Sequence, residues 1–287
     1  MAREAGGLEQ RPRAVAIGTF DGVHVGHRAV IRAAIDGTLT PTVVTFDPHP
    51  RAVLGGTVEL LATLERRLEL FAECGVEDVL VVPFTLEVAS LDPEAFARDY
   101  LFAVGAEVVV AGVGFRFGRE RSGDLALLRS LGLGARTVPL VEGVSSTRIR
   151  RLVHAGDVEH AARQLGRPVE VEGTVVGGDR RGTTLGFPTA NLDVPAHLLV
   201  PANGIYAGAT MGGHRTAVSI GVNPHYAGTE RRVEAFLLDW SGDLYGQRLV
   251  VQLWRRLRDE RAFESEAALV EQIGRDVADA HAATPPL

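Results

Sequence analysis

Residues 14–37, AVAIGTFDGVHVGHRAVIRAAIDG, decide the fold of the first half of the chain. They begin as a short apolar run typical of a buried strand, pass through a glycine-containing turn, and continue with the apolar period of a helix. Up to about Arg150 the chain repeats this alternation, and Gly37, Gly75 and Gly105 stand where helices are expected to end. We therefore expect a doubly wound parallel sheet, with ligands binding beyond the carboxyl ends of its strands.

The rhythm changes near residue 168, where short strand-like runs become separated by glycine-rich turns. Met211–Gly213 lies between two such runs and is expected to close a hairpin. Short strands at this spacing predict a small antiparallel β-barrel, and the amphipathic C-terminal segment predicts a helix packed against it. The expected organisation is a disordered N-terminus at 1–12, an α/β domain at 13–155, a helical linker at 156–167 and the barrel domain at 168–287.

The basic residues of the 287-residue chain exclude several chemistries, because all 30 of them are Arg and none is Lys. Without lysine there is no Schiff-base nucleophile, no GxxxxGK[ST] phosphate loop and no strand lysine of a protein kinase. A net charge of −6 argues against a nucleic-acid surface built on overall basicity. The single Cys74 excludes an internal disulfide and fits a reducing compartment, and no apolar run reaches the ~18 residues of a membrane span. We expect a cytoplasmic protein with no nucleic-acid or membrane partner.

A histidine pair follows the first strand. His24 and His27 stand three residues apart at the turn into the helix, with Gly18, Gly22 and Gly26 around them. Two imidazoles beside a helix start can donate hydrogen bonds to phosphate oxygens, and the glycines let a ligand approach the backbone. A turn with two surface histidines and a zinc-binding pair are the alternatives. The glycines and the place after the first strand favour nucleotide binding.

A second polar cluster, Ser145–Ser146–Thr147–Arg148, stands at an expected helix start. Hydroxyl groups and exposed backbone N–H groups at a helix start bind anions, and an arginine adds a bidentate fork. An ordinary helix cap explains the same residues. Taken alone, the cluster therefore leaves both interpretations open.

The stretch 178–193, GDRRGTTLGFPTANLD, is the strongest single motif of the second half. Thr189 and Asn191 lie two apart, so in an extended segment both face one side, and their oxygens suit Mg²⁺. The preceding loop can fold over phosphates with backbone N–H groups and two arginines, although a polar hairpin loop followed by a turn is the alternative. Farther along, Glu234 shares a strand face with apolar residues. It is either a paired core charge or a general base with a raised pKa.

The motifs GTFDGVHVGHR, TFDPHP, FRFGRERSGD and SSTRIR occur in this order, and together they resemble the adenylyltransferase half of the bacterial bifunctional riboflavin kinase/FAD synthetases. That half belongs to the HxGH nucleotidyltransferase superfamily. The motifs PTAN, GIYAG, SIGVNP, VEAFLLD and RLRDERAF resemble the riboflavin kinase domain of the same family. The resemblance implies that 168–287 phosphorylates riboflavin to FMN with ATP, and that 13–155 adenylylates FMN to FAD and releases pyrophosphate. It implies Mg²⁺ with ATP as co-substrate, the partners riboflavin, FMN and FAD, and a monomer or weak homo-oligomer.

The resemblance also implies roles for individual residues. His24, His27 and Arg148 would act on the triphosphate during adenylyl transfer, and Glu234 would be the base of the kinase reaction. The residues implied to bind ATP or its phosphates are Gly18, Phe20, Asp21, Gly22, Gly26, Ser145, Ser146, Thr147, Gly178, Asp179, Arg180, Arg181 and Gly182. Those implied to bind flavin are Phe46, Asp47, Gly114, Phe115, Arg258 and Phe263, and Thr189 and Asn191 would hold Mg²⁺.

Three positions depart from the family pattern. Gly114 stands where Asn or Asp is usual at the flavin site, Thr183 where Arg is common, and His225 where Thr is usual. The change at Gly114 motivates the alternative of a riboflavin kinase with weak or altered adenylyltransferase activity. A regulatory protein that binds flavin or nucleotide without turnover is the alternative from a different class, although a mere binder has no need of a base.

Overall fold

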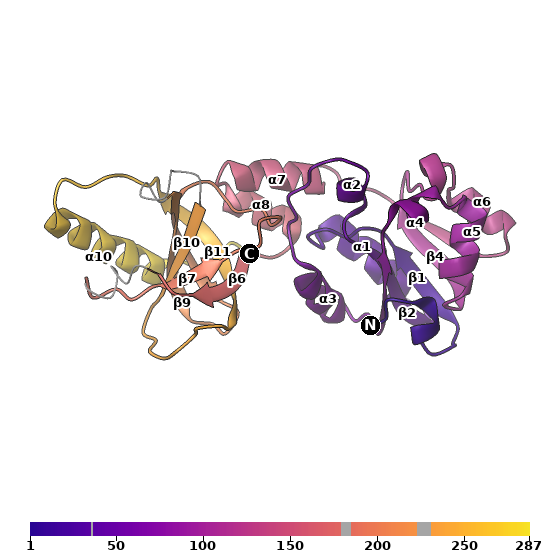
Figure 1. The fold of residues 1–287 in the computed structure, drawn as a ribbon, viewed down its shortest axis with the longest axis horizontal. Coiled ribbons are helices and arrows are strands. Elements are labelled where there is room, and N and C mark those ends of the chain that lie inside the picture. Colours follow the sequence, from indigo (N-terminus) through magenta and orange to yellow (C-terminus); the bar gives the residue numbers. More distant parts are fainter. Residues whose placement is uncertain (36, 179–184, 223–230) are drawn as a thin grey trace. The chain divides into compact units, whose positions relative to one another are not determined.

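The computed structural model describes residues 1–35, 37–178, 185–222 and 231–287. The chain divides into two compact units, Met1–Ser146 and Thr147–Leu287. The first unit is coloured indigo to magenta and the second pink to yellow in Figure 1. The division falls at the start of α7 (Ser146–His154), ahead of the expected linker, because α8 (Val158–Leu165) packs on strands of the second unit. The functional limits of the domains stay a prediction.

The first unit is built on a parallel sheet with the strand order β3-β2-β1-β4-β5, which confirms the expected α/β fold. Its strands are β1 (Arg13–Ile17), β2 (Thr40–Asp47), β3 (Asp78–Pro83), β4 (Ala106–Gly112) and β5 (Gly134–Val138). Its helical segments are η1 (Ala5–Gly7), α1 (Val25–Ile35), α2 (Pro50–Val53), α3 (Leu64–Glu73), α4 (Leu86–Ser90), α5 (Pro93–Phe96), the π-helical η2 (Ala97–Phe102), η3 (Arg119–Arg121) and α6 (Leu125–Ser130).

Alternate residues of the central strands feed two separate cores, as a sheet covered on both faces requires. Ala14 and Ala16 of β1 pack with buried residues of α1 and α3. Val15 and Ile17, the intervening residues, pack with buried residues of α5, η2 and α6 on the other face. The sheet is therefore doubly wound. Since β1 is flanked by β2 and β4, its carboxyl end lies at the point where the strand order reverses, the usual ligand site of such folds.

Residues 1–12 follow a defined path instead of the expected disorder. The Ala2 N–H donates to the Val79 carbonyl and the Val81 N–H donates to the Ala2 carbonyl, both at 2.9 Å. Ala2 and Leu8 are buried in the same core as the central strands. The segment thus covers part of the open edge of β3, whose backbone groups would otherwise face solvent.

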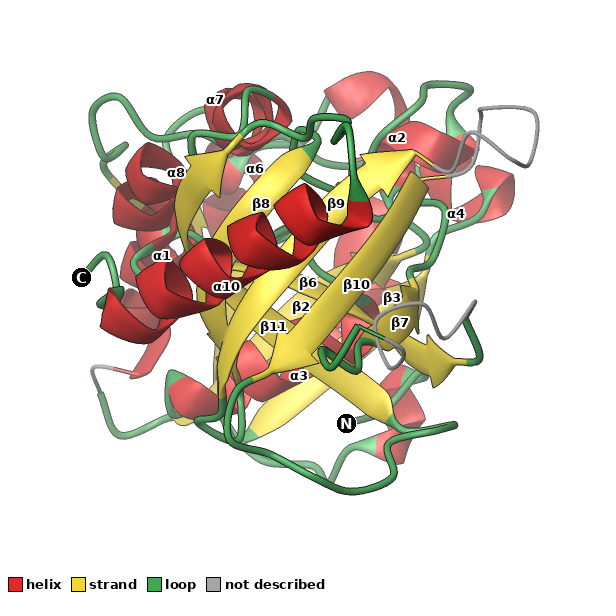
Figure 2. Cartoon of the chain, turned by 90° about the vertical axis from the view of Figure 1, so that its left-hand side faces the viewer, coloured by secondary structure: helices red, strands yellow, loops and turns green. Residues whose placement is uncertain are grey.

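The second unit is a closed barrel with the strand order β10-β7-β6-β11-β8-β9, all neighbours antiparallel, which confirms the expected barrel. Its strands are β6 (Val169–Val176), β7 (Ala190–Asp193), β8 (Gly204–Thr210), β9 (Arg215–Val222), β10 (Arg231–Leu237) and β11 (Arg248–Arg258), followed by α10 (Glu266–Ala282). Met211–Gly213 closes the β8–β9 hairpin as predicted. Figure 2 shows α10 lying across β8 and β9, where Ala280 and Ala283 pack on Ala207 and Trp254.

Within the described ranges, no helix combines the length and the apolar content that crossing a bilayer requires.

Candidate active sites

The turn that carries the histidine pair has an unusual backbone. Phe20 and Val23 have φ angles of 48° and 39°, in a region that residues with a side chain rarely adopt, and Gly22 between them has a φ of 78°. The Val23 N–H donates to the Phe20 carbonyl at 3.0 Å. The buried Asp21 carboxylate accepts a hydrogen bond from the Leu61 N–H at 2.9 Å. Strain of this kind persists only where surrounding contacts hold it, and it clusters at functional sites.

His24 and His27 lie face to face at the start of α1. Their rings are 3.5 Å apart between centroids and 17° from parallel. The His27 backbone N–H donates to His24 Nδ1 at 3.2 Å, so His24 caps the helix. Because Nδ1 accepts this bond, the neutral His24 ring carries its proton on Nε2, where it can donate to an anionic oxygen. A Cβ atom at Gly26 would lie 3.2 Å from the His24 ring, which explains why a residue without a side chain stands there.

The histidine pair has few of the features of a zinc site. Across the described ranges there is no group of three or more His, Cys, Asp and Glu side chains placed to hold a metal ion. A zinc site needs three or four such protein ligands. Among the described residues, the pair therefore lacks the third protein ligand that a zinc site needs.

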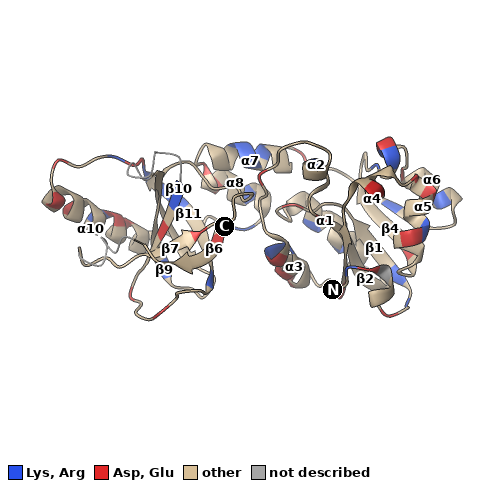
Figure 3. Ribbon diagram, in the orientation of Figure 1, with Lys and Arg blue, Asp and Glu red and all other residues tan. Residues whose placement is uncertain are grey.

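The serine cluster reaches the same turn. The Ser146 hydroxyl, at the first residue of α7, donates to the Asp21 carbonyl at 3.3 Å. This brings one predicted phosphate-binding residue to the histidine turn, and Ser145 directly precedes it. Thr147 and Arg148 follow in α7, whose basic residues are coloured blue in Figure 3, and their approach to the histidines stays a prediction.

The ends of β2 and β4 carry the predicted flavin residues. Phe46 is only 8% exposed, so it lies in the core. Its ring meets that of Phe84 edge to face, with the two ring centroids 5.6 Å apart. Gly114 has a φ of 78°, and a Cβ atom there would meet nothing within 4 Å. Phe115 stacks on Phe117 with ring centroids 5.7 Å apart. The β4 turn therefore presents an open, left-handed position, which is the conformation that Gly, Asn and Asp tolerate best.

Asp47 ends β2 between two guanidinium groups. Its Oδ1 lies 3.5 Å from Arg67 Nη2, and its Oδ2 lies 3.9 Å from Arg3 Nη2. The Arg67 side chain is 3% exposed, and burial lowers its pKa, against the opposing effect of the negative charges of Asp21 and Asp47. Sequence reasoning did not single out Arg67. Its signal is a place on the apolar face of α3, four residues before the buried Phe71.

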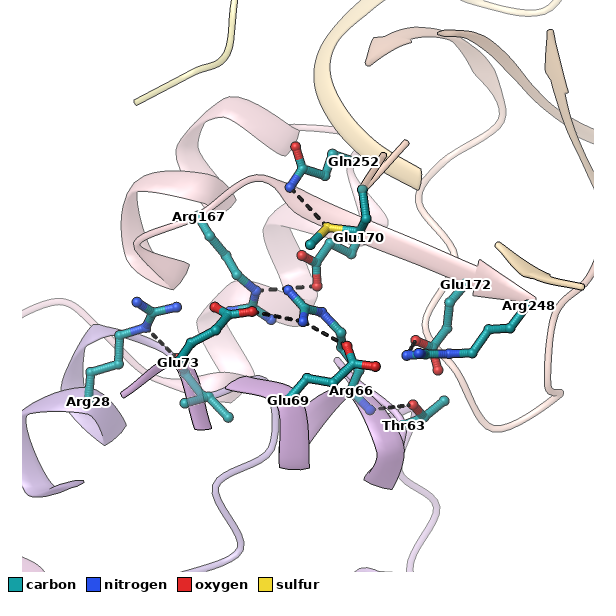
Figure 4. Close-up of polar contacts among 12 residues, drawn as sticks. Arg28, Thr63, Arg66, Glu69, Glu73, Arg167, Glu170, Glu172, Arg248 and Gln252 are labelled. Atoms are coloured by element: carbon teal, nitrogen blue, oxygen red, sulfur yellow. Dashed lines mark hydrogen bonds and ion pairs between the residues drawn. The ribbon is translucent and has the colours of Figure 1, made fainter. Parts of the chain in front are cut away.

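The neighbouring Arg66 has a different role. It pairs with Glu69 and Glu73 of its own helix at 2.8 and 3.0 Å, as Figure 4 shows, and the Thr63 hydroxyl caps that helix by accepting from the Arg66 N–H. The side chains of the two adjacent arginines therefore point in different directions. Arg66 pairs with residues of α3, and Arg67 reaches the carboxyl ends of β1 and β2.

The second candidate site lies on strands β7 and β10 of the barrel. The β7–β10 register places Asn191 opposite Glu234, and the Thr189 hydroxyl donates to Glu234 Oε2 at 3.3 Å. Because this proton points to the carboxylate, the lone pairs of the hydroxyl oxygen face elsewhere and can bind a cation. A Cβ atom at Gly178 would lie 2.2 Å from Asn191 Nδ2, so only glycine allows the amide to lie there. Four predicted residues, from three separate segments, therefore come together.

The donor set of this cluster fits magnesium. Hydroxyl, amide and carboxylate oxygens are the hard ligands that Mg²⁺ prefers, and no sulfur or imidazole is among these three side chains. Glu234 is half-buried beside the alternating buried residues Val233 and Ala235. The predicted phosphate-loop residues Asp179, Arg180, Arg181 and Gly182 lie outside the described residues, as do Thr183 and His225.

Arg258 and Phe263 are predicted to bind flavin, and Arg258 is held by the terminal helix. Arg258 makes three hydrogen bonds to the buried Asp276 of α10, from Nε to Oδ1 at 2.9 Å and to Oδ2 at 3.2 Å, and from Nη2 to Oδ2 at 2.7 Å. The Phe263 ring lies 5.7 Å from the Arg258 guanidinium and 5.0 Å from that of Arg261. The pair is thus joined to the fold, and its contact with flavin stays a prediction.

In this unit, buried acidic groups also pair within the barrel: Figure 4 shows Arg248 beside Glu172, at 2.8 Å. This pair joins the neighbouring strands β6 and β11. The Glu234 cluster differs from it, because Glu234 has a hydroxyl partner instead of an arginine among its described contacts.

Both halves of the chain are similar to known proteins. A family model described as FAD synthetase matches residues 8–149, and one described as riboflavin kinase matches residues 165–284. A bifunctional riboflavin kinase/FMN adenylyltransferase of Listeria monocytogenes is 37% identical, over 94% of this chain and 92% of its own length. Its counterpart in Bacillus subtilis is 35% identical, over 95% and 92%. A Streptococcus pneumoniae crystal structure, described as a macrolide-efflux protein, matches 99% of both chains at a TM-score of 0.88 and 30% identity.

Proposed function

The chain belongs to the family of bifunctional riboflavin kinases/FMN adenylyltransferases, and we propose that its two sites make FMN and then FAD at the residues described above. In the first reaction the 5′-hydroxyl of riboflavin takes the γ-phosphoryl group of ATP, giving FMN, ADP and a proton. In the second, FMN and another ATP give FAD and pyrophosphate. The observation that carries the proposal is the convergence of Thr189, Asn191 and Glu234 in one half and of the stacked histidines in the other.

In the kinase half, Glu234 accepts the proton of the attacking hydroxyl. A neutral alcohol is a weak nucleophile, so a positioned carboxylate lowers its barrier. Thr189 orients that carboxylate through its hydrogen bond, and Asn191 is held across the ladder from it. Thr189 and Asn191 are the residues that would hold Mg²⁺, which when bound neutralises charge on the phosphates. Gly178 would approach the phosphates of ATP, and Asp179, Arg180, Arg181 and Gly182, which lie outside the described residues, stay predicted phosphate-binding residues.

In the adenylyltransferase half, an FMN phosphate oxygen attacks the α-phosphorus of ATP, and the bond to pyrophosphate breaks. The nucleophile is already an anion, so this half needs no strong base. His24 donates from Nε2, and with His27 stabilises the charge that develops on the phosphate oxygens. The N-terminus of α1 adds backbone N–H groups, and Ser145, Ser146, Thr147 and Arg148 approach the phosphates from the start of α7.

The remaining properties are proposals of the same kind. We propose functional limits of 13–155 and 168–287, with 156–167 as a linker, and Mg²⁺ as the metal in both reactions. A net charge of −6 and a single cysteine support a cytoplasmic enzyme without nucleic-acid or membrane partners. We propose a monomer or weak homo-oligomer.

One observation favours a second candidate. Gly114 offers the flavin no polar side chain, which favours a riboflavin kinase with weak adenylyltransferase activity. A regulatory binder without turnover is disfavoured, because the Thr189–Glu234 contact serves a base that binding does not need.

The test is an assay of purified protein with Mg-ATP and either riboflavin or FMN, with products separated chromatographically. We expect FAD from FMN, and FMN followed by FAD from riboflavin. If FMN accumulates without FAD, the protein has riboflavin kinase activity and no adenylyltransferase activity. No product from either flavin would reject both enzymatic functions.

A further inference from the structure

Arg67 is a buried cation that the two proposed reactions do not use, and it lies at the end of the sheet where the histidine turn begins. It comes from α3, and its Nη1 donates to the Thr19 carbonyl at 2.9 Å and to the Phe46 carbonyl at 3.3 Å. The same nitrogen lies 3.4 Å from Thr45 Oγ1, and Nη2 lies 3.5 Å from Asp47 Oδ1. One guanidinium group therefore joins the segment after β1 to the last residues of β2.

The partners of Arg67 are all oxygen atoms, and they lie at the carboxyl edge of the parallel sheet. Two of them are the backbone carbonyl groups of Thr19 and Phe46, and the carboxylates of Asp21 and Asp47 add negative charge near Arg67. An anionic triphosphate would be repelled by such an edge. A guanidinium group stays protonated even when buried, and its planar fork suits several carbonyl oxygens at once. Arg67 thus supplies a fixed positive charge in a chain that has no lysine.

The contact with Thr19 also bears on the histidines. Thr19 immediately precedes the strained residues Phe20 to Val23, and His24 follows them. The Thr45 hydroxyl donates to the same Thr19 carbonyl at 3.1 Å. Asp21 ties the turn to Leu61, just before the helix that carries Arg67. The path of the turn is therefore fixed from two sides, and loss of Arg67 removes the stronger of the two donors to Thr19.

We propose that Arg67 is a positioning residue of the adenylyltransferase site: it holds the histidine turn against the end of β2 and offsets the negative charge of that edge. The inference rests on the proposed function, since it assigns a role in FMN adenylylation. Arg67 is almost fully enclosed, so it acts through the turn and does not touch the substrate.

The first test compares both reactions in one preparation of the full chain. In Arg67→Met the kcat for FAD formation is expected to fall about 100-fold, because a displacement of about 1 Å at the reacting groups costs that much. Riboflavin phosphorylation should stay within about twofold, which shows that the second unit is folded, and an unchanged far-UV circular dichroism spectrum should show the same of the first unit. Arg67→Lys, which keeps the charge but not the fork, should recover about a tenth of the wild-type rate. The lysine variant carries the test if the methionine variant does not fold.

Two matched controls separate positioning from general loss of stability. Arg66→Met removes the adjacent buried arginine of α3, and Arg3→Met removes the other guanidinium group beside Asp47 from its exposed side. Thr19 is not among the described contacts of Arg66 or of Arg3. The rate of FAD formation in both variants should therefore stay within about threefold of the wild-type rate. An equal loss in Arg66→Met and Arg67→Met would overturn the positioning role.

The second test measures coupling to the histidine. If Arg67 acts through the turn, Arg67→Met should cost less than about threefold in a His24→Asn background, because residues that act as a unit are non-additive. A further full 100-fold loss would contradict the inference. Wild-type protein that makes no FAD from FMN would reject the proposed adenylyltransferase and the role of Arg67 with it. FAD formation at the wild-type rate in Arg67→Met would reject only the role of Arg67.

Discussion

The two candidate sites, both built without lysine, differ in the groups that they offer to ATP. In the first unit, the candidate groups follow a central parallel strand, where a strained turn leads into the stacked imidazoles at the start of α1 and Ser146 of α7 donates to the same turn. In the second, oxygen atoms of Thr189, Asn191 and Glu234 lie on neighbouring antiparallel segments and are brought together by strand register. The first site is therefore rich in donors for anions, and the second is rich in acceptors for a cation.

The charge of the nucleophile explains this difference. FMN attacks with a phosphate oxygen that is already negative, so its site needs charge stabilisation and alignment. Riboflavin attacks with a neutral hydroxyl, so its site needs a base as well. In our proposal, the stacked histidines stabilise the developing charge, and Glu234 is the base. Changes at one site should therefore leave the other reaction unchanged, and the sizes of the losses should follow these roles.

The largest effect is expected for Glu234→Gln. The amide keeps the size of the carboxylate and an oxygen for the Thr189 hydroxyl, but it cannot take a proton. Riboflavin phosphorylation should fall about 1,000-fold, a typical contribution of general-base catalysis. FAD formation from added FMN, measured in the same preparation, should not change. A parallel loss of both activities would show that the two sites are not separate.

A smaller effect is expected for His24→Asn. Asparagine is a good helix cap and can replace His24 in accepting the His27 N–H, so stability should change little. Its short side chain cannot reach where Nε2 donates, and FAD formation should fall about 100-fold, the usual cost of one lost donor to a developing anion.

Thermal unfolding and riboflavin phosphorylation are the controls for that variant. His24→Ala should lose as much adenylyltransferase activity and also about 1 kcal/mol of stability, because alanine cannot cap. If His24→Asn kept its activity, the histidine would be only a cap and the site would depend on other donors.

Sequence patterns predicted the architecture well because period and glycine placement are local properties. The unbroken apolar run of residues 14–17 is enough to predict a strand buried on both faces, and its alternate residues do pack in two separate cores. The contacts that build the sites are not local. Thr189 meets Glu234 across 45 positions, and only the β7–β10 register decides that they face each other.

Arg258 and Arg67 illustrate the limit further. The family resemblance predicts Arg258 at the flavin end of the barrel, but its three bonds to Asp276 depend on how α10 crosses the strands. Arg67 stands next to Arg66 in the sequence, and a helical period alone does not tell which of them turns toward the sheet. Likewise, the polar residues 1–12 read as a frayed end, whereas the open edge of β3 offers Ala2 a partner.

A third prediction tests the dependence of the kinase site on close packing. In Gly178→Ala the new Cβ would lie 2.2 Å from Asn191 Nδ2, so the amide must move away. Riboflavin phosphorylation should fall about 20-fold, as for other changes that displace a metal-holding group, and more Mg²⁺ should be needed for half-maximal rate. Gly177→Ala is the matched control, because a Cβ atom there meets nothing within 4 Å. Equal losses in the two variants would mean that the loop is sensitive to any side chain and that Asn191 is not the cause.

The smallest effect concerns Gly114, where the first site lacks a polar side chain. Asparagine tolerates the φ of 78° at this position, and a Cβ atom there meets no neighbour within 4 Å, so Gly114→Asn should fold as the wild type does. One added hydrogen bond to the flavin, worth about 1 kcal/mol, should lower the KM for FMN about fivefold. Gly132→Asn is the control, since Gly132 has a φ of 93° and equally open surroundings at the end of α6. An unchanged KM in Gly114→Asn would place the flavin away from the β4 turn. A fivefold gain confined to FMN would explain a weak adenylyltransferase by one missing side chain and leave the comparison between the two sites intact.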